Sequence, residues 1–432
     1  MGRTACDALI IGSGMGGMSA AALLAKAGLK VLVAEGLPRL GGRCSTVEYK
    51  GFKCPTGVIG AEMGGPVEEV FLKTGAEFNV RPAGPPRYLI GGTIHRVPAK
   101  GGMKSLLDAA GGETEDIEKV LQAFSRAMGW MEPSAALSLR EWLLQFTHDE
   151  RILGLFQTMV SAAMVVNADE LPAREFFRFV KTLGGIRRFG FCPAGSINLP
   201  NALLKVIVDL GGEIWTEAPV VRILVEKGVV LGAKVRRKEK ELEVRAKIVI
   251  SNAGPKKTVA LAGEENFDTG YLRDLERNLR PAPLFGIQMS ADEPLIEQEY
   301  LLITGSRRVN ALFQPTLLCP ELAPPGKHLV IAGAAPASSM PPVQVKRELE
   351  ICLEDLRSLI QEFDKRTRIL LAGSYHGDWP GMHSWPGLDM PQKTSIVNLY
   401  NVGDGVKPSG TVALPGAVAS ALAVAEEVKR RI

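Results

Sequence analysis

The chain has 432 residues, and its 51 lysines and arginines are balanced by 47 aspartates and glutamates, which leaves a net charge of +4. This charge is too small for the basic surface that a nucleic-acid partner requires, whereas 46% apolar residues suffice for the cores of two domains. The six cysteines show neither a C-x-x-C pair nor metal-ligand spacing, so we expect no metal site and free thiols in a reducing compartment.

The first predicted element is a short apolar strand at residues 8–11, which runs into the pattern G-x-G-x-x-G formed by Gly12, Gly14 and Gly17. Gly12 permits a tight turn, Gly14 lets the backbone approach a pyrophosphate, and Gly17 lets the next helix pack closely on the strand. Ser13 lies in the same loop. We therefore assign these four residues to a nucleotide-binding loop, with a purely structural turn as the alternative.

An alanine- and leucine-rich helix is predicted from Met15 to Ala27, ending at the C-cap residue Gly28. Its N-terminus would direct free N–H groups at an anion on the glycine loop. A second strand at residues 29–34 ends at Glu35, whose carboxylate can accept hydrogen bonds from a ribose diol and would repel a 2′-phosphate. The sequence thus predicts a dinucleotide-binding βαβ unit that disfavours NADP.

Directly after this unit, Arg39, Gly41, Gly42, Arg43 and Thr46 form the pattern R-x-G-G-R-x-x-[ST]. In these residues the chain resembles the superfamily of flavin-containing amine oxidases and phytoene desaturases. The resemblance implies that Gly41 and Gly42 lie against the dinucleotide and Arg43 near the flavin and pyrophosphate, and it favours FAD over NAD. It also implies an α/β fold, with a Rossmann-like FAD-binding domain of the p-hydroxybenzoate hydroxylase and amine oxidase type and a second, α+β substrate domain.

The following region changes from turns to helices. A β-hairpin is expected at residues 81–98 around Gly91-Gly92. The longest apolar run, 152–168, is interrupted by polar residues and too short to span a bilayer, so we interpret it as a buried helix. The helices expected here cover residues 66–74, 115–129, 138–146, 149–165 and 172–183.

Phenylalanines and basic residues are interleaved at the end of this helical region. Such a mixture is typical of a helix with a buried apolar face and a solvated basic face, and it is also found where a protein contacts an anionic membrane surface. The residues concerned are Phe176, Phe177, Phe179, Phe189 and Phe191, with Arg178, Lys181, Arg187 and Arg188.

From Cys192 the chain is predicted to return to the nucleotide-binding domain. A helix is expected at 197–210, and the family resemblance implies that the backbone of Val220 meets the adenine, with Ile223 packing beneath it. A plain sheet extension is the alternative. The strands expected here cover residues 213–216, 220–225, 229–235, 242–244 and 246–251.

Residues 263–365 are predicted to leave this domain again, with strands at 281–290 and 327–333 and an amphipathic helix at 345–363. We therefore expect a discontinuous FAD-binding domain and a discontinuous substrate domain. The segments are 1–75, 192–262 and 366–432 for the first domain, and 76–191 and 263–365 for the second.

The C-terminal segment carries the other strong pattern: a strand at 397–402, then Gly403-Asp404, and a helix at 415–431. The resemblance implies that Asp404 lies by the ribityl and pyrophosphate groups of FAD, and that the loop at Val412 and Ala413 faces flavin N1 and the C2 carbonyl. A helix N-terminus there would stabilise the charge of a reduced flavin. No cysteine follows Cys352, so we expect FAD to be bound without a covalent bond.

Aromatic and titratable residues gather just before this last strand. The resemblance places this region beside the substrate face of the flavin, where a histidine can act as an acid or a base. Packing against the core is the alternative for the tryptophans, and we assign no catalytic residue. The cluster consists of Tyr375, His376, Asp378, Trp379, His383 and Trp385.

These patterns predict a flavin-dependent oxidoreductase that transfers hydride between a substrate carbon and flavin N5. The substrate implied by the resemblance is a small molecule, most simply an apolar isoprenoid or polyene. Oxidation of an amine is the second hypothesis, and a flavin-free module that binds prenylated proteins, like the GDP-dissociation inhibitors, is the third. Because the chain starts almost directly with a strand and has no myristoylation pattern, we expect it in the cytoplasm, with or without peripheral membrane contact.

Overall fold

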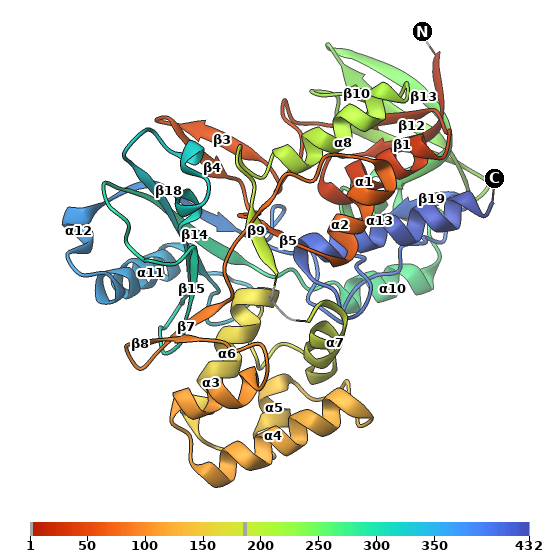
Figure 1. Cartoon of the computed structure of the whole chain (residues 1–432). Coiled ribbons are helices and arrows are strands. Elements are labelled where there is room, and N and C mark those ends of the chain that lie inside the picture. The colour runs from red at the N-terminus through yellow and green to blue at the C-terminus, as the bar shows by residue number, and fades with distance from the viewer. Residues whose placement is uncertain (1–2, 185–187, 432) are drawn as a thin grey trace.

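The computed structural model describes residues 3–184 and 188–431. Two seven-stranded sheets dominate the architecture, and a group of helices lies below them in the view of Figure 1. The other strands of the described residues form two smaller sheets. The smaller sheets consist of β3 (Thr46–Tyr49) with β4 (Phe52–Pro55), and of β5 (Ala61–Glu62), β9 (Phe189–Phe191) and β6 (Arg81–Pro82).

Five strands of the first sheet run parallel to one another, and two more extend it antiparallel. The strands are β1 (Arg3–Ile11), β2 (Val31–Ala34), β10 (Glu213–Trp215), β11 (Val220–Glu226), β12 (Val229–Arg237), β13 (Lys240–Ser251) and β19 (Leu399–Asn401). Their order is β10-β2-β1-β13-β12-β11, with β19 paired to β13. The carboxyl ends of β1, β2, β13 and β19 therefore meet at one edge, where open α/β sheets bind their ligands.

Helices cover both faces of this sheet because the strand residues alternate between two cores. Ala8 and Ile10 face one core, while Leu9 and Ile11 face the other. The first core is closed by α1 (Met15–Lys26), α2 (Gly65–Thr74), α8 (Asn198–Asp209) and α13 (Ala413–Lys429). The second core includes residues of α9 (Pro255–Ala262) and α10 (Thr269–Asn278), and the short η1 (Glu264–Asn266) connects these two helices.

The second sheet is mainly antiparallel, with one parallel pair. Its strands are β7 (Arg87–Ile90), β8 (Thr93–Arg96), β14 (Leu284–Ala291), β15 (Tyr300–Ile303), β16 (Val309–Phe313), β17 (His328–Ala334) and β18 (Thr367–Tyr375). Their order is β18-β14-β17-β16-β15-β7-β8. The helices α11 (Val345–Leu359) and α12 (Phe363–Arg366) cover its outer face (Figure 1), and η2 (Pro315–Leu317) and η3 (Pro320–Leu322) connect β16 to β17.

The remaining helices form a third core with the inner side of the second sheet. They are α3 (Gly102–Ala110), α4 (Thr114–Gly129), α5 (Leu139–Leu143), α6 (Glu150–Met164) and α7 (Ala173–Leu183). The buried apolar helix predicted for residues 152–168 is confirmed as α6, which begins at the side-chain cap Asp149. In the part of the chain that the structure describes, no helix is long and apolar enough to cross a membrane.

The α/β prediction is confirmed, and the hairpin around Gly91-Gly92 is present as β7 and β8. Two predicted strands, 242–244 and 246–251, are instead one continuous strand, because β13 pairs with β1 from Glu243 to Ser251 without a break. The C-terminal helix begins at Ala413, two residues earlier than predicted. β18 pairs with β14 in the second sheet, although residues 367–375 were assigned to the nucleotide-binding segment; the domain division as a whole stays a prediction.

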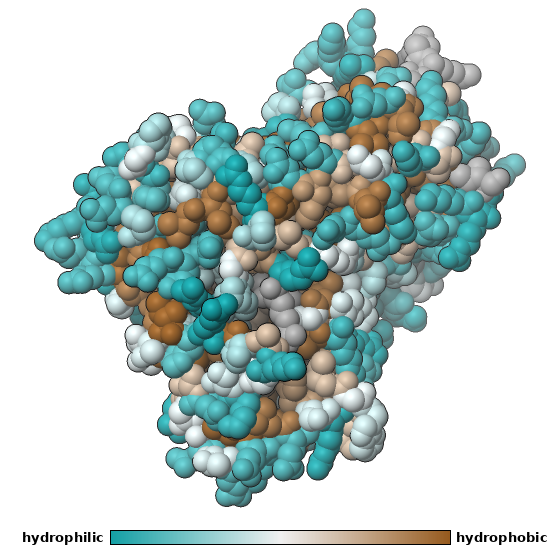
Figure 2. Space-filling model, viewed as in Figure 1, coloured by the Kyte–Doolittle hydropathy of each residue, from teal (hydrophilic) through white to brown (hydrophobic). Residues whose placement is uncertain are grey.

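The phenylalanines of α7 pack into the third core. Phe176, Phe177 and Phe179 are buried, and the first two contact each other and further aromatic side chains edge to face. Arg178 on the same helix forms an ion pair with Glu132. On the face shown in Figure 2, hydrophilic side chains predominate and apolar residues lie in separate groups. The interpretation of a buried face with a basic outer face therefore holds for α7; Arg187 lies outside the described residues.

Candidate functional site

A cavity of about 470 Å³ lies at the carboxyl ends of the parallel strands of the first sheet. It extends from the loops after β1, β2 and β13 to the inner side of the second sheet and the C-terminal end of α6. Its volume is within the range of natural ligand sites. The predicted binding residues that line it are Gly12, Gly14, Glu35, Gly41, Gly42, Arg43, Val220, Gly403, Asp404 and Ala413.

The glycine loop forms a close-packed backbone cradle at this edge. Gly12 has a φ of +89°, which a residue with a side chain rarely adopts. A Cβ on Gly14 would clash with the amide of Asn252, and one on Gly16 would lie 2.6 Å from its Oδ1. No side chain caps the N-terminus of α1, so its first N–H groups are directed at the cavity. The cradle thus suits an anionic group held by backbone donors.

Two predicted residues of this loop act behind the cavity wall. Ser13 donates from its backbone N (2.7 Å) and its Oγ (2.6 Å) to Oε2 of Glu35. A Cβ on Gly17 would clash with the carbonyl of Gly12, so this glycine allows α1 to pack on β1. Oε1 of Glu35 accepts from the backbone N of Leu37 (2.8 Å). The Glu35 carboxylate is therefore fixed at the cavity wall with lone pairs left for a diol.

The centre of the cavity is organised by a two-point ion pair. Nη1 and Nη2 of Arg43 lie 2.8 Å and 2.7 Å from the two carboxylate oxygens of Asp404. His383 donates from its backbone N to the same carboxylate (3.1 Å) and places Nδ1 2.8 Å from Oδ1. Burial raises the pKa of Asp404, but Arg43 and His383 lower it by more, so the pKa lies well below its usual range. Asp404 is therefore ionised.

A buried lysine that sequence reasoning missed supports this centre from behind. The ammonium of Lys407 is fully buried and donates to the backbone O of Asp404 (3.0 Å), to the backbone O of Ser384 (2.7 Å) and to Oδ1 of Asp389 (2.6 Å). Burial raises the pKa of Asp389 to about 6, although Lys407 lowers it. This arrangement ties the loop after β19 to the segment that carries His383. No sequence motif identifies Lys407 as a site residue. Its position three residues after Asp404 is the one sequence feature that could have suggested a role.

The N-terminus of α13 reaches the cavity at Ala413, whose φ of +42° is strained for a residue with a Cβ. Val412 is the N-cap residue, and its side chain is buried in the third core instead of lining the cavity. Glu175 of α7 holds the preceding loop by accepting from Ser409 Oγ (2.8 Å) and Gly410 N (3.2 Å). The Glu175 carboxylate of α7 therefore positions the N-terminus of α13.

The far end of the cavity is apolar. Val165 ends α6 with a φ of +58°, an unusual conformation for a β-branched residue and a mark of local constraint. The walls here come from α6, β9, β16 and the chain around β18. They are formed by Ala162, Ala163, Val165, Phe189, Leu284, Phe313, Tyr375 and Trp379, with Glu62 as an acidic exception.

The predicted aromatic cluster before the last strand divides between the cavity and the core. Tyr375, Asp378, Trp379 and His383 line the cavity. Trp385 is instead buried in the third core, where its Nε1 donates to the backbone O of Pro281 (3.3 Å), so for this tryptophan the core alternative holds. His376 is exposed and does not line the cavity.

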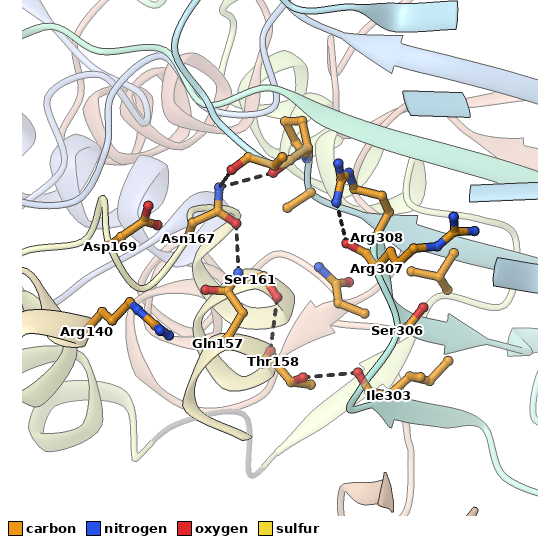
Figure 3. A pocket seen from close by; sticks show the side chains of 15 residues that line it. Arg140, Gln157, Thr158, Ser161, Asn167, Asp169, Ile303, Ser306, Arg307 and Arg308 are labelled. Atoms are coloured by element: carbon orange, nitrogen blue, oxygen red, sulfur yellow. Dashed lines mark hydrogen bonds between the residues drawn. The ribbon is translucent and has the colours of Figure 1, made fainter. Parts of the chain in front are cut away.

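A second cavity of about 350 Å³ lies between α6 and the second sheet (Figure 3). Thr158 donates to the backbone O of Ile303 (3.1 Å), and Asn167 bonds to Gln157 (2.7 Å) and to the backbone O of Pro336 (3.1 Å). These bonds fasten α6 to the sheet. They thereby fix the residues at its end that line the main cavity.

Comparisons with known proteins agree with this geometry. A family model described as flavin containing amine oxidoreductase matches residues 15–429. An uncharacterised protein of Methanocaldococcus jannaschii is 28% identical over 424 residues, which are 96% of this chain and 97% of that protein. Prolycopene isomerase of Daucus carota is 25% identical over 387 residues, covering 75% of this chain and 60% of that protein. An inactive all-trans-retinol 13,14-reductase of Danio rerio is 28% identical over 301 residues, 57% of this chain but only 47% of that protein.

Solved structures share the fold over nearly the whole chain. An oxidoreductase of Methanosarcina mazei has a TM-score of 0.85 at 29% identity and covers 97% of this chain and 100% of its own. Putrescine oxidase, solved with putrescine, has a TM-score of 0.72 with full coverage of both chains, but at 15% identity it shows the fold alone. With the family model spanning residues 15–429, the chain belongs to the flavin-containing amine oxidoreductase family, whose members are oxidoreductases that use a flavin.

Proposed function

We propose that the protein is an oxidoreductase with non-covalently bound FAD that acts on an apolar isoprenoid or polyene. The observation that carries this proposal is the continuity of one cavity, in which a glycine cradle and an ionised polar centre lead directly into an apolar chamber. A dinucleotide placed along the first half would present its reactive ring to the second half.

The residues present fit FAD on structural grounds. The cradle has no room for side chains at Gly14 and Gly16, and the N-terminus of α1 has no cap of its own. Glu35 would hold the ribose, the cradle the pyrophosphate, and Val220 would border the adenine, as predicted from the sequence. Arg43 and Asp404 would lie beside the central part of the cofactor.

FAD, when bound, supplies hydride exchange with a substrate carbon. The chain's own contribution is positioning and electrostatics. The uncapped N-terminus of α13 at Ala413 would stabilise negative charge on the ring. Arg43 is locked by Asp404 and by the backbone oxygens of Pro380 (3.1 Å) and Gly381 (2.7 Å), so its charge stays fixed during reaction. The apolar walls exclude water from the reacting carbon.

An apolar substrate is supported by the walls of the chamber, which consist mostly of alanine, valine, leucine and aromatic side chains. The names of two relatives, an inactive all-trans-retinol 13,14-reductase and a prolycopene isomerase, refer to polyenes as well. Amine oxidation is the second candidate, because Tyr375 and Trp379 both line the chamber and aromatic side chains could flank an amine. A flavin-free prenyl-binding module is disfavoured by the intact cradle.

An anaerobic titration of the purified holoprotein tests the substrate class. The oxidised protein is mixed with putrescine and benzylamine, and the photoreduced protein is mixed with all-trans-retinol and prolycopene, while the flavin absorbance is followed. We expect reoxidation or product formation with a polyene and no bleaching by amines. Bleaching by an amine without any polyene reaction would replace our proposal with the second candidate.

A further inference from the structure

Glu62 is an acidic residue in the apolar end of the main cavity. It lies at the end of β5, where it pairs with Phe189 of β9, and both residues line the cavity. Phe189 in turn packs against Phe313, so Glu62 lies beside the aromatic side chains of the apolar end. Removing a carboxyl group from water costs free energy unless a hydrogen bond or a counter-charge compensates for it.

Glu62 is half-buried, and its carboxyl lacks the partners that the buried carboxylates of this chain have. Glu35 accepts three hydrogen bonds, Asp404 is paired with Arg43, and Glu175 accepts from Ser409 and Gly410. For Glu62, no hydrogen bond or ion pair from another side chain exists among residues 3–184 and 188–431. Its oxygens are therefore available to whatever fills the chamber.

No other side chain in the described part of the chain contributes to the pKa shift of Glu62, which is caused mainly by burial. Burial raises the pKa of Glu62 to about 7, although a hydrogen bond from its own backbone N–H lowers it, so acid and carboxylate are both populated near neutral pH. The pKa of the neighbouring Cys44 thiol is raised well above its usual range by burial, so that thiol is uncharged. The other titratable or charged groups on the elements around it and on the cavity wall are Glu35, Glu68, Arg188, Lys257, Tyr375, Asp378 and the Arg43–Asp404–His383 centre.

We propose that Glu62 is the acid–base residue of this cavity, exchanging a proton with the polyene carbon next to the one that exchanges hydride. This inference rests on the proposed function. In the saturating direction, one carbon of a C=C bond receives hydride from the reduced flavin and its neighbour receives the proton from Glu62. The π bond breaks, two C–H bonds form, the flavin is oxidised, and Glu62 is left as a carboxylate that regains a proton from solvent.

Infrared difference spectroscopy of the holoprotein tests the proton itself. Between pH 5 and pH 9, the wild type is expected to lose the carbonyl band of a protonated carboxyl group with a midpoint near pH 7, and Glu62→Gln is expected to lack this transition. Both proteins are expected to keep the separate transition of Asp389, whose pKa is about 6. Glu48→Gln, which removes an exposed carboxylate on β3, serves as the matched control and should keep the transition near pH 7. If Glu62→Gln keeps the carbonyl transition near pH 7 unchanged, the assignment to Glu62 is wrong.

Single-turnover reaction of the photoreduced protein with all-trans-retinol tests the role. The wild-type rate should fall as the pH rises through about 7, because the acid form is required. Glu62→Gln should be slower by about 10²-fold or more and lose this pH dependence, while its flavin content stays at the wild-type level. Glu62→Asp, which keeps an acid, should recover part of the rate.

The outcomes separate the two proposals. Turnover by the wild type together with an unchanged rate and pH profile in Glu62→Gln overturns the role of Glu62 and leaves the proposed function intact. Failure of the wild type with retinol and prolycopene, with flavin bound, overturns the proposed substrate class and the role of Glu62 with it.

Discussion

The two ends of the main cavity differ in how their polar groups are satisfied. At the nucleotide end, Glu35, Arg43 and Asp404 each have several fixed partners. At the chamber end, the walls are apolar, Glu62 has no side-chain partner among the described residues, and Val165 adopts a left-handed backbone conformation. One end is thus built to hold a ligand of fixed structure, whereas the other is shaped by packing and leaves the Glu62 carboxyl for the ligand.

The largest effect on stability is expected from breaking the central ion pair. Arg43→Met leaves the buried Asp404 carboxylate without its main counter-charge, which should lower the free energy of unfolding by about 3 kcal/mol. Chemical denaturation with and without added FAD measures it. A loss below about 0.5 kcal/mol would show that the pair is no more than a surface contact.

The Arg43–Asp404 ion pair also makes the free energy of unfolding depend on pH in the acid range. The pKa of Asp404 is lower in the folded protein than the value of about 3.9 for an unfolded chain, so its stabilisation is fully present above about pH 4 and is lost as the pH falls below that value. We expect wild-type stability to fall steeply there and Arg43→Met to show a shallower dependence. Parallel slopes in the two proteins would contradict the assignment.

Gly14→Ala should mainly affect cofactor binding. Its Cβ would clash with Asn252, and moving that side chain into the cradle should weaken FAD binding by up to about 3 kcal/mol. Equilibrium dialysis measures the affinity, and the double variant with Asn252→Ala is the control, because it removes the clashing amide. If the double variant binds no better than Gly14→Ala, the steric explanation is wrong.

Glu35→Gln tests the ribose contact. The amide keeps the size of the side chain but cannot accept all the hydrogen bonds from Ser13, Leu37 and a ribose diol, so FAD affinity should fall by about 1–2 kcal/mol. Binding of FMN, which has no adenosine ribose, should hardly change between the two proteins. Unchanged FAD affinity would remove Glu35 from the binding site.

The smallest effect is expected at the chamber end. Val165→Gly relieves the strained backbone at φ +58° and should stabilise the protein by about 1 kcal/mol, while the wider chamber loosens substrate contact. Thermal unfolding measures the gain, with the buried Val160→Gly on the same helix as the destabilising control. A destabilised Val165→Gly protein would show that packing outweighs strain at this position.

Sequence patterns predicted which residues meet at the polar end of the cavity, because those residues follow local spacing. Gly12, Gly14, Glu35 and Arg43 lie within two short stretches, and the structure brings them to one cavity with Asp404 from the far end of the chain. The groups that hold the centre were not predictable in this way. Lys407 and Glu175 act through tertiary contacts between separate elements, and no periodicity or motif encodes such contacts.

The chamber end was predicted least well for the same physical reason. Residues from α6, β5, β9 and β16 meet there only because the second sheet and the helices pack together. Apolar residues in a core and in a cavity wall give the same sequence pattern. Sequence reasoning therefore did not distinguish Trp385, which is buried, from Trp379, which lines the cavity. It also did not distinguish Glu62 from the other acidic residues. A strand boundary was misjudged too, since Arg245 interrupts the apolar pattern of β13 without interrupting its pairing.

The most direct test of the account is the cofactor itself. The protein is purified, heated under mild denaturing conditions and filtered, and the flavin in the filtrate is identified by mass spectrometry and quantified against the polypeptide. We predict one FAD per chain, all of it released from the polypeptide. Protein that is colourless and cannot be reconstituted with FAD, or flavin that stays attached to the denatured chain, would contradict it.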